Sequence, residues 1–170
     1  DDHPLVRRGL RETLNAGGIE VAGETGTPDD VVPLLRRTAC DVLLLDLSLP
    51  GKTGLDLLAD IRTAFPRLPV LVVSTYTEAQ YAVRAFRSGA AGYLSKTCGP
   101  DELVHAVRTI FTAGRHVTPA AAVALADSTL QRAAEPRHQA LSNREHEVLR
   151  LLVGGQTVSE IAARLSLSAK

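Results

Sequence analysis

The stretch Asp-Val-Leu-Leu-Leu-Asp-Leu-Ser-Leu-Pro-Gly at residues 41–51 decides the fold. Its apolar run does not alternate with polar residues, which is typical of a strand covered on both faces in a parallel sheet. The run ends at Asp46, and Pro50 with Gly51 favours a turn before the next helix. In open α/β sheets, chemistry takes place just beyond the carboxyl ends of the strands. The stretch therefore predicts a buried strand that presents the Asp46 carboxylate at the functional edge of a sheet.

Extended and helical patterns alternate around this strand. Helical patterns begin at Pro4, Pro28, Leu57, Glu78 and Pro100, and strand candidates cover 19–23, 41–46, 69–75 and 91–95. This alternation predicts a parallel sheet with helices on both faces. Since the chain opens on a helix, we expect a first strand before Asp1. With that strand, residues 1–112 form an α/β domain whose five-stranded, doubly wound parallel sheet is flavodoxin-like.

The pattern becomes all-helical in the last third of the chain. Residues 113–140 are rich in alanine and predict a linker that contains a helix. Residues 142–145 and 157–160 read as capping boxes, each of which starts a short helix. Two short helices joined by a glycine-containing turn predict a small helix-turn-helix domain at 141–170. A third helix would begin at Ser168, so we expect this domain to be truncated.

Composition narrows the class of protein without identifying it. The chain has 170 residues, 45% of them hydrophobic, which suffices for one or two domains with a core. Nineteen basic and nineteen acidic residues cancel, so any binding to nucleic acid must be local. Cys40 and Cys98 have neither the number nor the spacing of a disulfide framework or a zinc site, which favours a cytoplasmic setting. The sequence shows neither a membrane span nor a signal peptide.

Polar residues follow the predicted strands where each one ends. Asp1 and Asp2 would follow the first strand, and Asp46, Ser74 and Lys96 follow later ones. Singly, each has an ordinary interpretation as a solvated acid, a strand-end hydroxyl or a surface lysine. Together, clustered aspartates repel each other unless a hard cation such as Mg²⁺ neutralises them. Their joint placement favours a phosphoryl-transfer site in which Asp46 is the nucleophile.

Two sets of motifs resemble one known family. The first set resembles the CheY-like receiver domain of two-component response regulators; it comprises Asp-Asp-His at 1–3, the strand ending at Asp46, Ser-Thr at 74–75 and Gly-Tyr-Leu-Ser-Lys at 92–96. The second set resembles the LuxR-type helix-turn-helix of the NarL/FixJ class; it comprises Leu-Ser-Asn-Arg-Glu-His-Glu-Val-Leu at 141–149 and Thr-Val-Ser-Glu-Ile-Ala at 157–162. Together the sets span nearly the whole chain.

The resemblance implies a phosphoacceptor and a metal site. Asp46 would take a phosphoryl group from the phosphohistidine of a sensor histidine kinase. Asp1 and Asp2 would bind Mg²⁺ together with Asp46, and Asp2 is expected to be the more direct ligand of the pair. The backbone carbonyl of Ser48 would be a further protein ligand.

The resemblance also implies a switch around the phosphoryl group. Ser74 would be the switch hydroxyl, and Lys96 would pair with the phosphate. Tyr93, which on its own would read as ordinary packing, would report the state by an inward or outward rotamer. The new dianion on Asp46 would then move two loops and bias the surface of the last helices. Thr97 replaces the proline that is common after this lysine in receivers.

The function implied is that of a transcription regulator: phosphorylation promotes homodimerisation, which pairs two helix-turn-helix units on DNA. One alternative is a Mg²⁺-dependent phosphatase or phosphotransferase, although no carboxylate stands two residues after Asp46 to act as general acid. Another is a DNA-binding dimer that does not depend on phosphorylation. The dimer surface would use either the first and last helices of the receiver or the region that begins with the helix at 78–88. Family resemblance favours the first pairing.

Overall fold

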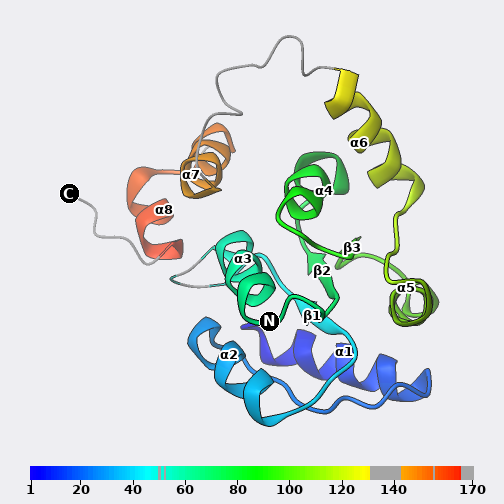
Figure 1. Cartoon of the computed structure of the whole chain (residues 1–170). Helices are drawn as coiled ribbons and strands as arrows, with labels where there is room; N and C mark the ends of the chain where they lie inside the picture. Colours follow the sequence, from blue (N-terminus) through cyan, green and yellow to red (C-terminus); the bar gives the residue numbers. More distant parts are fainter. Residues whose placement is uncertain (50, 52, 131–142, 155, 166–170) are drawn as a thin grey trace.

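A three-stranded parallel sheet lies at the centre of the first domain (Figure 1). The computed structural model describes residues 1–49, 51, 53–130, 143–154 and 156–165. The strands are β1 (Leu43–Leu45), β2 (Val70–Ser74) and β3 (Gly92–Ser95), and they lie in the order β1-β2-β3. The helices are α1 (Pro4–Ala16), α2 (Pro28–Arg37), α3 (Gly54–Ala64), α4 (Glu78–Arg87), α5 (Pro100–Ala113), α6 (Pro119–Leu130), α7 (Asn143–Val153) and α8 (Val158–Arg164).

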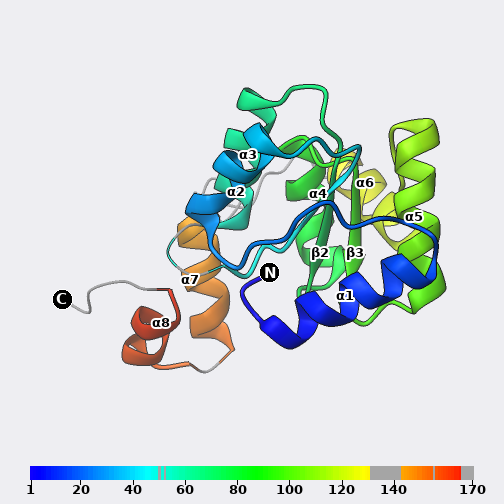
Figure 2. The same ribbon diagram turned by 90° about the horizontal axis from the view of Figure 1, so that it is seen from below.

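The central strand β2 divides the first domain into two cores. Its side chains alternate, so that Val70 and Val72 face one core while Leu71 and Val73 face the other. The first core contains residues of α2, α3 and α4, and the second contains residues of α1 and α5. Figures 1 and 2 show these helices on both sides of the sheet. The prediction of a parallel α/β sheet covered on both faces is confirmed.

Most helix boundaries follow from capping chemistry. Proline occupies the first turn of α1, α2 and α5, where a missing N–H costs no helical hydrogen bond. Gly114 ends α5 with a φ of 76°, a left-handed conformation that glycine adopts without strain. The capping box at the start of α8 is confirmed, because Thr157 and Glu160 each accept the other's backbone N–H. The predicted cap at Ser142 and the third helix at Ser168 lie outside the described residues.

The prediction of a strand at 19–23 is wrong for this structure. These residues have no strand assignment, and the sheet has three strands among the described residues instead of the five expected. In the flavodoxin-like order, this segment would lie beside the first strand, and no strand pairs with it among the described residues. An apolar cavity of about 680 Å³ lies between residues 19–23 and β1. On its opposite side, β1 pairs with β2.

Helix α5 packs only part of its apolar side chains against the core. Leu103, Val107 and Ile110 are buried, whereas Phe111 is 64% exposed. Phe111 borders the apolar cavity beside β1.

Among its described residues, the last third of the chain contains the predicted linker helix and the two predicted helices of the helix-turn-helix. Helix α6 falls within the proposed linker, and residues 131–142 of that linker lie outside the described residues. Helices α7 and α8 form a small core of their own from Leu151, Ile161 and Leu165, against which Val148 packs. None of the helices in the described ranges is both long and apolar enough to cross a membrane.

Acid is expected to destabilise the fold through His116, which connects α5 to α6. Its Nε2 is buried without a hydrogen-bond partner, and burial followed by the charge of His105 lowers the pKa of the imidazole from 6.5. Below that value the unfolded chain binds a proton that the folded chain does not, so stability falls as the pH drops and levels off below the folded pKa.

Replacement of His116 by glutamine removes this titration. We therefore expect a smaller loss of melting temperature for His116→Gln than for the parent between about pH 7.5 and about pH 5.5. His105→Gln should give an intermediate loss, since it removes the second cause of the shift. Equal losses in all three proteins would contradict the assignment.

Candidate phosphoacceptor site

The Asp46 carboxylate lies at the carboxyl end of β1 and is almost fully buried, with its side chain 1% exposed. The Ser48 N–H donates to Asp46 Oδ1 at 2.9 Å, which fixes the rotamer of the side chain. The loop then turns back, because the Gly54 N–H donates to the Leu47 carbonyl and Thr53 caps α3 by accepting the Asp56 N–H. The described part of the loop is thus held at Ser48 and at Gly54, while Pro50 of the predicted turn lies outside the described residues.

Lys96 joins two acidic side chains at this strand edge. Its Nζ lies 2.6 Å from Asp46 Oδ2 and 2.7 Å from Asp1 Oδ2. The position of Lys96 is set by the sheet, because its backbone N–H donates to the Ser74 carbonyl at the end of β2. Both carboxylates are at least nine-tenths buried, so their mutual repulsion is poorly screened by water. The single ammonium charge therefore offsets part of the repulsion between these two carboxylates, which would otherwise destabilise the fold.

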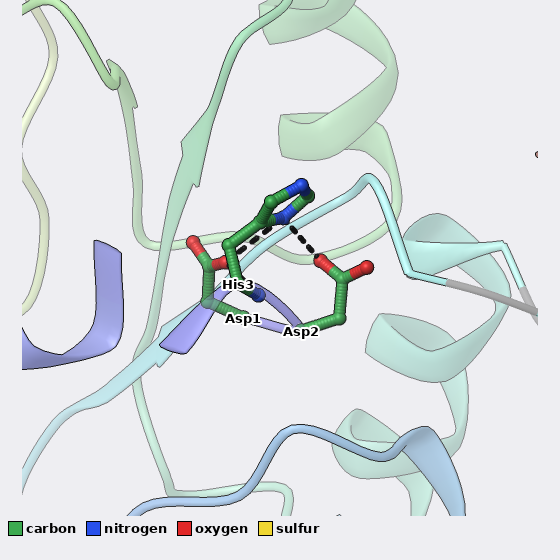
Figure 3. A group of neighbouring side chains, drawn as sticks. All are labelled: Asp1, Asp2 and His3. Carbon is green, nitrogen blue, oxygen red and sulfur yellow. Dashed lines mark hydrogen bonds and ion pairs between the residues drawn. The ribbon is translucent and has the colours of Figure 1, made fainter. Parts of the chain in front are cut away.

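The Asp2 carboxylate points toward His3 (Figure 3). The His3 Nδ1 atom lies 2.7 Å from Asp2 Oδ1 and 3.6 Å from Asp1 Oδ1, and the His3 N–H donates to Asp1 Oδ1. One potential ligand atom from each of these residues falls within 4.8 Å of the others. The structure thus brings Asp1 to Asp46 through Lys96, and it gives Asp2 a separate partner.

The donor set fits a hard divalent cation. Asp1, Asp2 and Asp46 supply carboxylate oxygens, the donors that Mg²⁺ prefers. The Lys96 ammonium lies between two of these carboxylates, those of Asp1 and Asp46, and supplies positive charge there. The assignment of Asp2 as the more direct ligand, and of the Ser48 carbonyl as a further ligand, stays a prediction.

Removal of the Lys96 charge tests this electrostatic balance. Lys96→Met should destabilise the protein by about 3 kcal/mol without divalent ions, because it removes the cation shared by two buried carboxylates. Mg²⁺ should restore much of the loss, giving a larger Mg²⁺-dependent rise in melting temperature for the variant than for the parent. The matched control is Arg8→Met, which breaks an exposed ion pair with Glu12 and should change neither quantity appreciably. The idea fails if Lys96→Met and Arg8→Met respond alike.

Ser74 and Tyr93, the predicted switch residues, lie in one buried network. The Tyr76 N–H donates to Ser74 Oγ at 3.3 Å, and the Tyr93 hydroxyl donates to the Tyr76 carbonyl at 2.8 Å. Both Ser74 and Tyr93 are fully buried, so the tyrosine ring points inward. Burial raises the pKa of the Tyr93 phenol, and the Ser74 hydroxyl partly opposes that rise. The hydroxyl at the end of β2 is thus linked to the aromatic side chain of β3.

Sequence reasoning missed two members of this network. The ring of Tyr76 stacks on that of Tyr81, with 4.4 Å between centroids and 19° between planes. Both rings are buried in the core that also contains Tyr93, so the three tyrosines of the chain lie in one cluster. The sequence feature that could have indicated them is their spacing: Tyr76 follows Ser74 by two residues, and Tyr81 lies in the first turns of the next helix.

Comparison with known proteins shows the family to which this chain belongs. Residues 1–108 match the response regulator receiver domain, and residues 139–170 match the luxR family of bacterial regulatory proteins. The chain therefore belongs to the two-component response regulators that carry a LuxR-type DNA-binding domain. It is 36% identical to the response regulator UvrY of Escherichia coli K12 across 100% of this chain and 79% of that protein. It is 33% identical to the response regulator GacA of Pseudomonas protegens across 100% of this chain and 80% of that protein.

Solved structures give the same class. A LuxR-family two-component response regulator from Aurantimonas matches with a TM-score of 0.69 and 33% identity, over 76% of this chain and 94% of that one. An RcsB response regulator described in complex with DNA matches with a TM-score of 0.68 and 28% identity, over 99% of this chain and 81% of that one. The predicted class, a response regulator with a receiver and a LuxR-type helix-turn-helix, is confirmed.

Proposed function

We propose that Asp46 accepts a phosphoryl group from the phosphohistidine of a sensor histidine kinase. The observation that carries the proposal is the buried Asp46 carboxylate at the end of β1, paired with Lys96 and joined through it to Asp1. In the reaction, an Asp46 oxygen attacks phosphorus, an acyl phosphate bond forms, and the bond from phosphorus to the histidine nitrogen breaks.

The residues around Asp46 would have different roles in this transfer. Lys96 contacts the attacking Asp46 carboxylate and would pair with a phosphoryl oxygen once the negative charge lies on the phosphoryl group. Asp1, Asp2 and the Ser48 carbonyl are the proposed protein ligands of Mg²⁺ beside Asp46. When bound, Mg²⁺ would neutralise the charge that develops on the phosphoryl oxygens. Ser74 would donate its hydroxyl to the same group.

We further propose that phosphorylation promotes a homodimer that binds DNA through two helix-turn-helix units. Support for DNA binding comes from the LuxR-type match at 139–170 and from the RcsB relative whose structure is described with DNA. For the dimer, we favour the first and last receiver helices, α1 and α5, because α6 lies over α4 (Figure 1). We propose a regulatory rather than an enzymatic role, exercised in the cytoplasm, where the proposed DNA partner would be found.

Treatment with a small phosphodonor tests this function directly. Acetyl phosphate with Mg²⁺ is expected to add the mass of one phosphoryl group to the chain, and beryllofluoride with Mg²⁺ is expected to shift the protein from monomer to dimer. Intact-mass spectrometry and light scattering measure the two effects. If neither mass nor oligomeric state responds, the proposed switch is wrong.

A further inference from the structure

Helix α6 is a docked part of the receiver domain and not a free connector. It packs along α4, as Figure 1 shows, and Ala121 on its first turn is fully buried in the core that contains Ala82 and Ala85 of α4. Alanine on both helices permits a close approach of the two backbones. On another side of α6, Val123 is 61% exposed, so one face of the helix is covered and another faces solvent.

A hydrogen bond connects the start of α6 to the start of α4. The buried Thr118 hydroxyl donates to a carboxylate oxygen of Glu78, and Thr118 Oγ1 accepts the Ala121 N–H at 3.1 Å. Thr118 therefore caps α6 and ties it to α4 at the same time. A carboxylate acceptor makes this hydrogen bond stronger than one between two neutral groups.

The α4 end of this contact is close in sequence to the proposed switch. Glu78 is the first residue of α4 and stands four residues after Ser74. Between them, Tyr76 donates its N–H to Ser74 Oγ and stacks on Tyr81 of α4. The Ser74 atom that accepts from Tyr76 is the one that would approach a phosphoryl group on Asp46. A displacement of Ser74 would therefore move Tyr76 and, through the stacked rings, the first turns of α4.

We propose that the contact between Thr118 and Glu78 is a clamp that holds α6 on α4, and that phosphorylation of Asp46 loosens it. The coupling half of this inference rests on the proposed function; the clamp itself does not. Since α6 leads toward the helix-turn-helix, release of the clamp would free the connection between the two domains. Helix α6 thus covers α4 of the same chain until Asp46 is phosphorylated.

Hydrogen exchange of residues 119–130 in the full chain tests the clamp. Glu78→Ala removes the acceptor but leaves Thr118 to cap α6, so exchange should become about tenfold faster without any phosphodonor. Glu78→Gln keeps a carbonyl acceptor and should restore most of the protection. The matched control is Glu102→Ala, which removes an exposed acid from the first turn of α5 and should leave exchange of α6 unchanged. Equal exchange in the Glu78→Ala and Glu102→Ala proteins would overturn the clamp.

Beryllofluoride with Mg²⁺ tests the coupling. In the parent chain it should speed exchange of residues 119–130, and in Glu78→Ala it should add little. If α6 stays protected in a parent chain that takes up a phosphoryl group from acetyl phosphate, the coupling is wrong while the proposed function stands. If the chain takes up no phosphoryl group at all, the proposed function fails and the coupling fails with it, whereas the variants without phosphodonor still decide the clamp.

Discussion

Replacing Asp46 by asparagine is expected to abolish phosphoryl uptake from acetyl phosphate. The carboxylate oxygen is the proposed nucleophile, and a neutral amide at that position cannot form an acyl phosphate. The fold should survive, because asparagine has nearly the same shape and can still accept the Ser48 N–H. Intact-mass spectrometry should therefore show one added phosphoryl group in the parent chain and none in the variant.

Asp41 provides a matched control for this experiment. Asp41 precedes β1, whereas Asp46 follows it, so the two residues lie at opposite ends of the strand. The Asp41 side chain is exposed. Asp41→Asn should take up as much phosphoryl group as the parent. Equal labelling of the Asp46→Asn protein would show that another residue is the acceptor, and loss of labelling in both variants would point to a general effect of charge.

Gly54→Ala is expected to cause a large loss of stability. A Cβ atom at this first residue of α3 would lie 2.3 Å from Leu47 Cα and 2.7 Å from the Asp46 carbonyl oxygen. Both contacts are with backbone, so no side chain can rotate away to relieve them. The loop after Asp46 would have to move, and we expect the free energy of unfolding to fall by about 3 kcal/mol in urea titrations.

Gly9 is the control for the general effect of adding a methyl group. It lies on the exposed side of α1, and a Cβ there would meet nothing within 4 Å. Gly9→Ala should raise the free energy of unfolding by about 0.5–1 kcal/mol, because alanine favours the helix. A Gly54→Ala protein as stable as the parent would mean that the close approach of α3 to the Asp46 loop is not needed.

The sequence was sufficient to predict the elements whose signals are local. The unbroken apolar run before Asp46 predicted β1, and capping chemistry predicted the start of α8 at Thr157 and Glu160. The gathering of Asp1, Asp46 and Lys96 followed from one rule, that parallel strands present their carboxyl ends at the same edge.

Features that depend on tertiary contacts were not predictable in the same way. Residues 19–23 have an extended pattern, but a strand needs a neighbour with which to pair, and the pattern does not contain that neighbour. Helix α6 is rich in alanine and lacks a clear polar face, so its pattern does not show which side packs on α4. The stacking of Tyr76 on Tyr81 depends on how the loop after β2 folds back onto α4.

The position of the phosphoryl group is the most direct test of the account. The parent chain would be treated with acetyl phosphate and Mg²⁺, the acyl phosphate reduced with borohydride, and the modified residue located by peptide mass spectrometry. We expect the modification on Asp46 alone, in the peptide that contains residues 41–49. Modification at Asp1, Asp2 or any other residue, with Asp46 unmodified, would contradict the assignment of Asp46 as the phosphoacceptor.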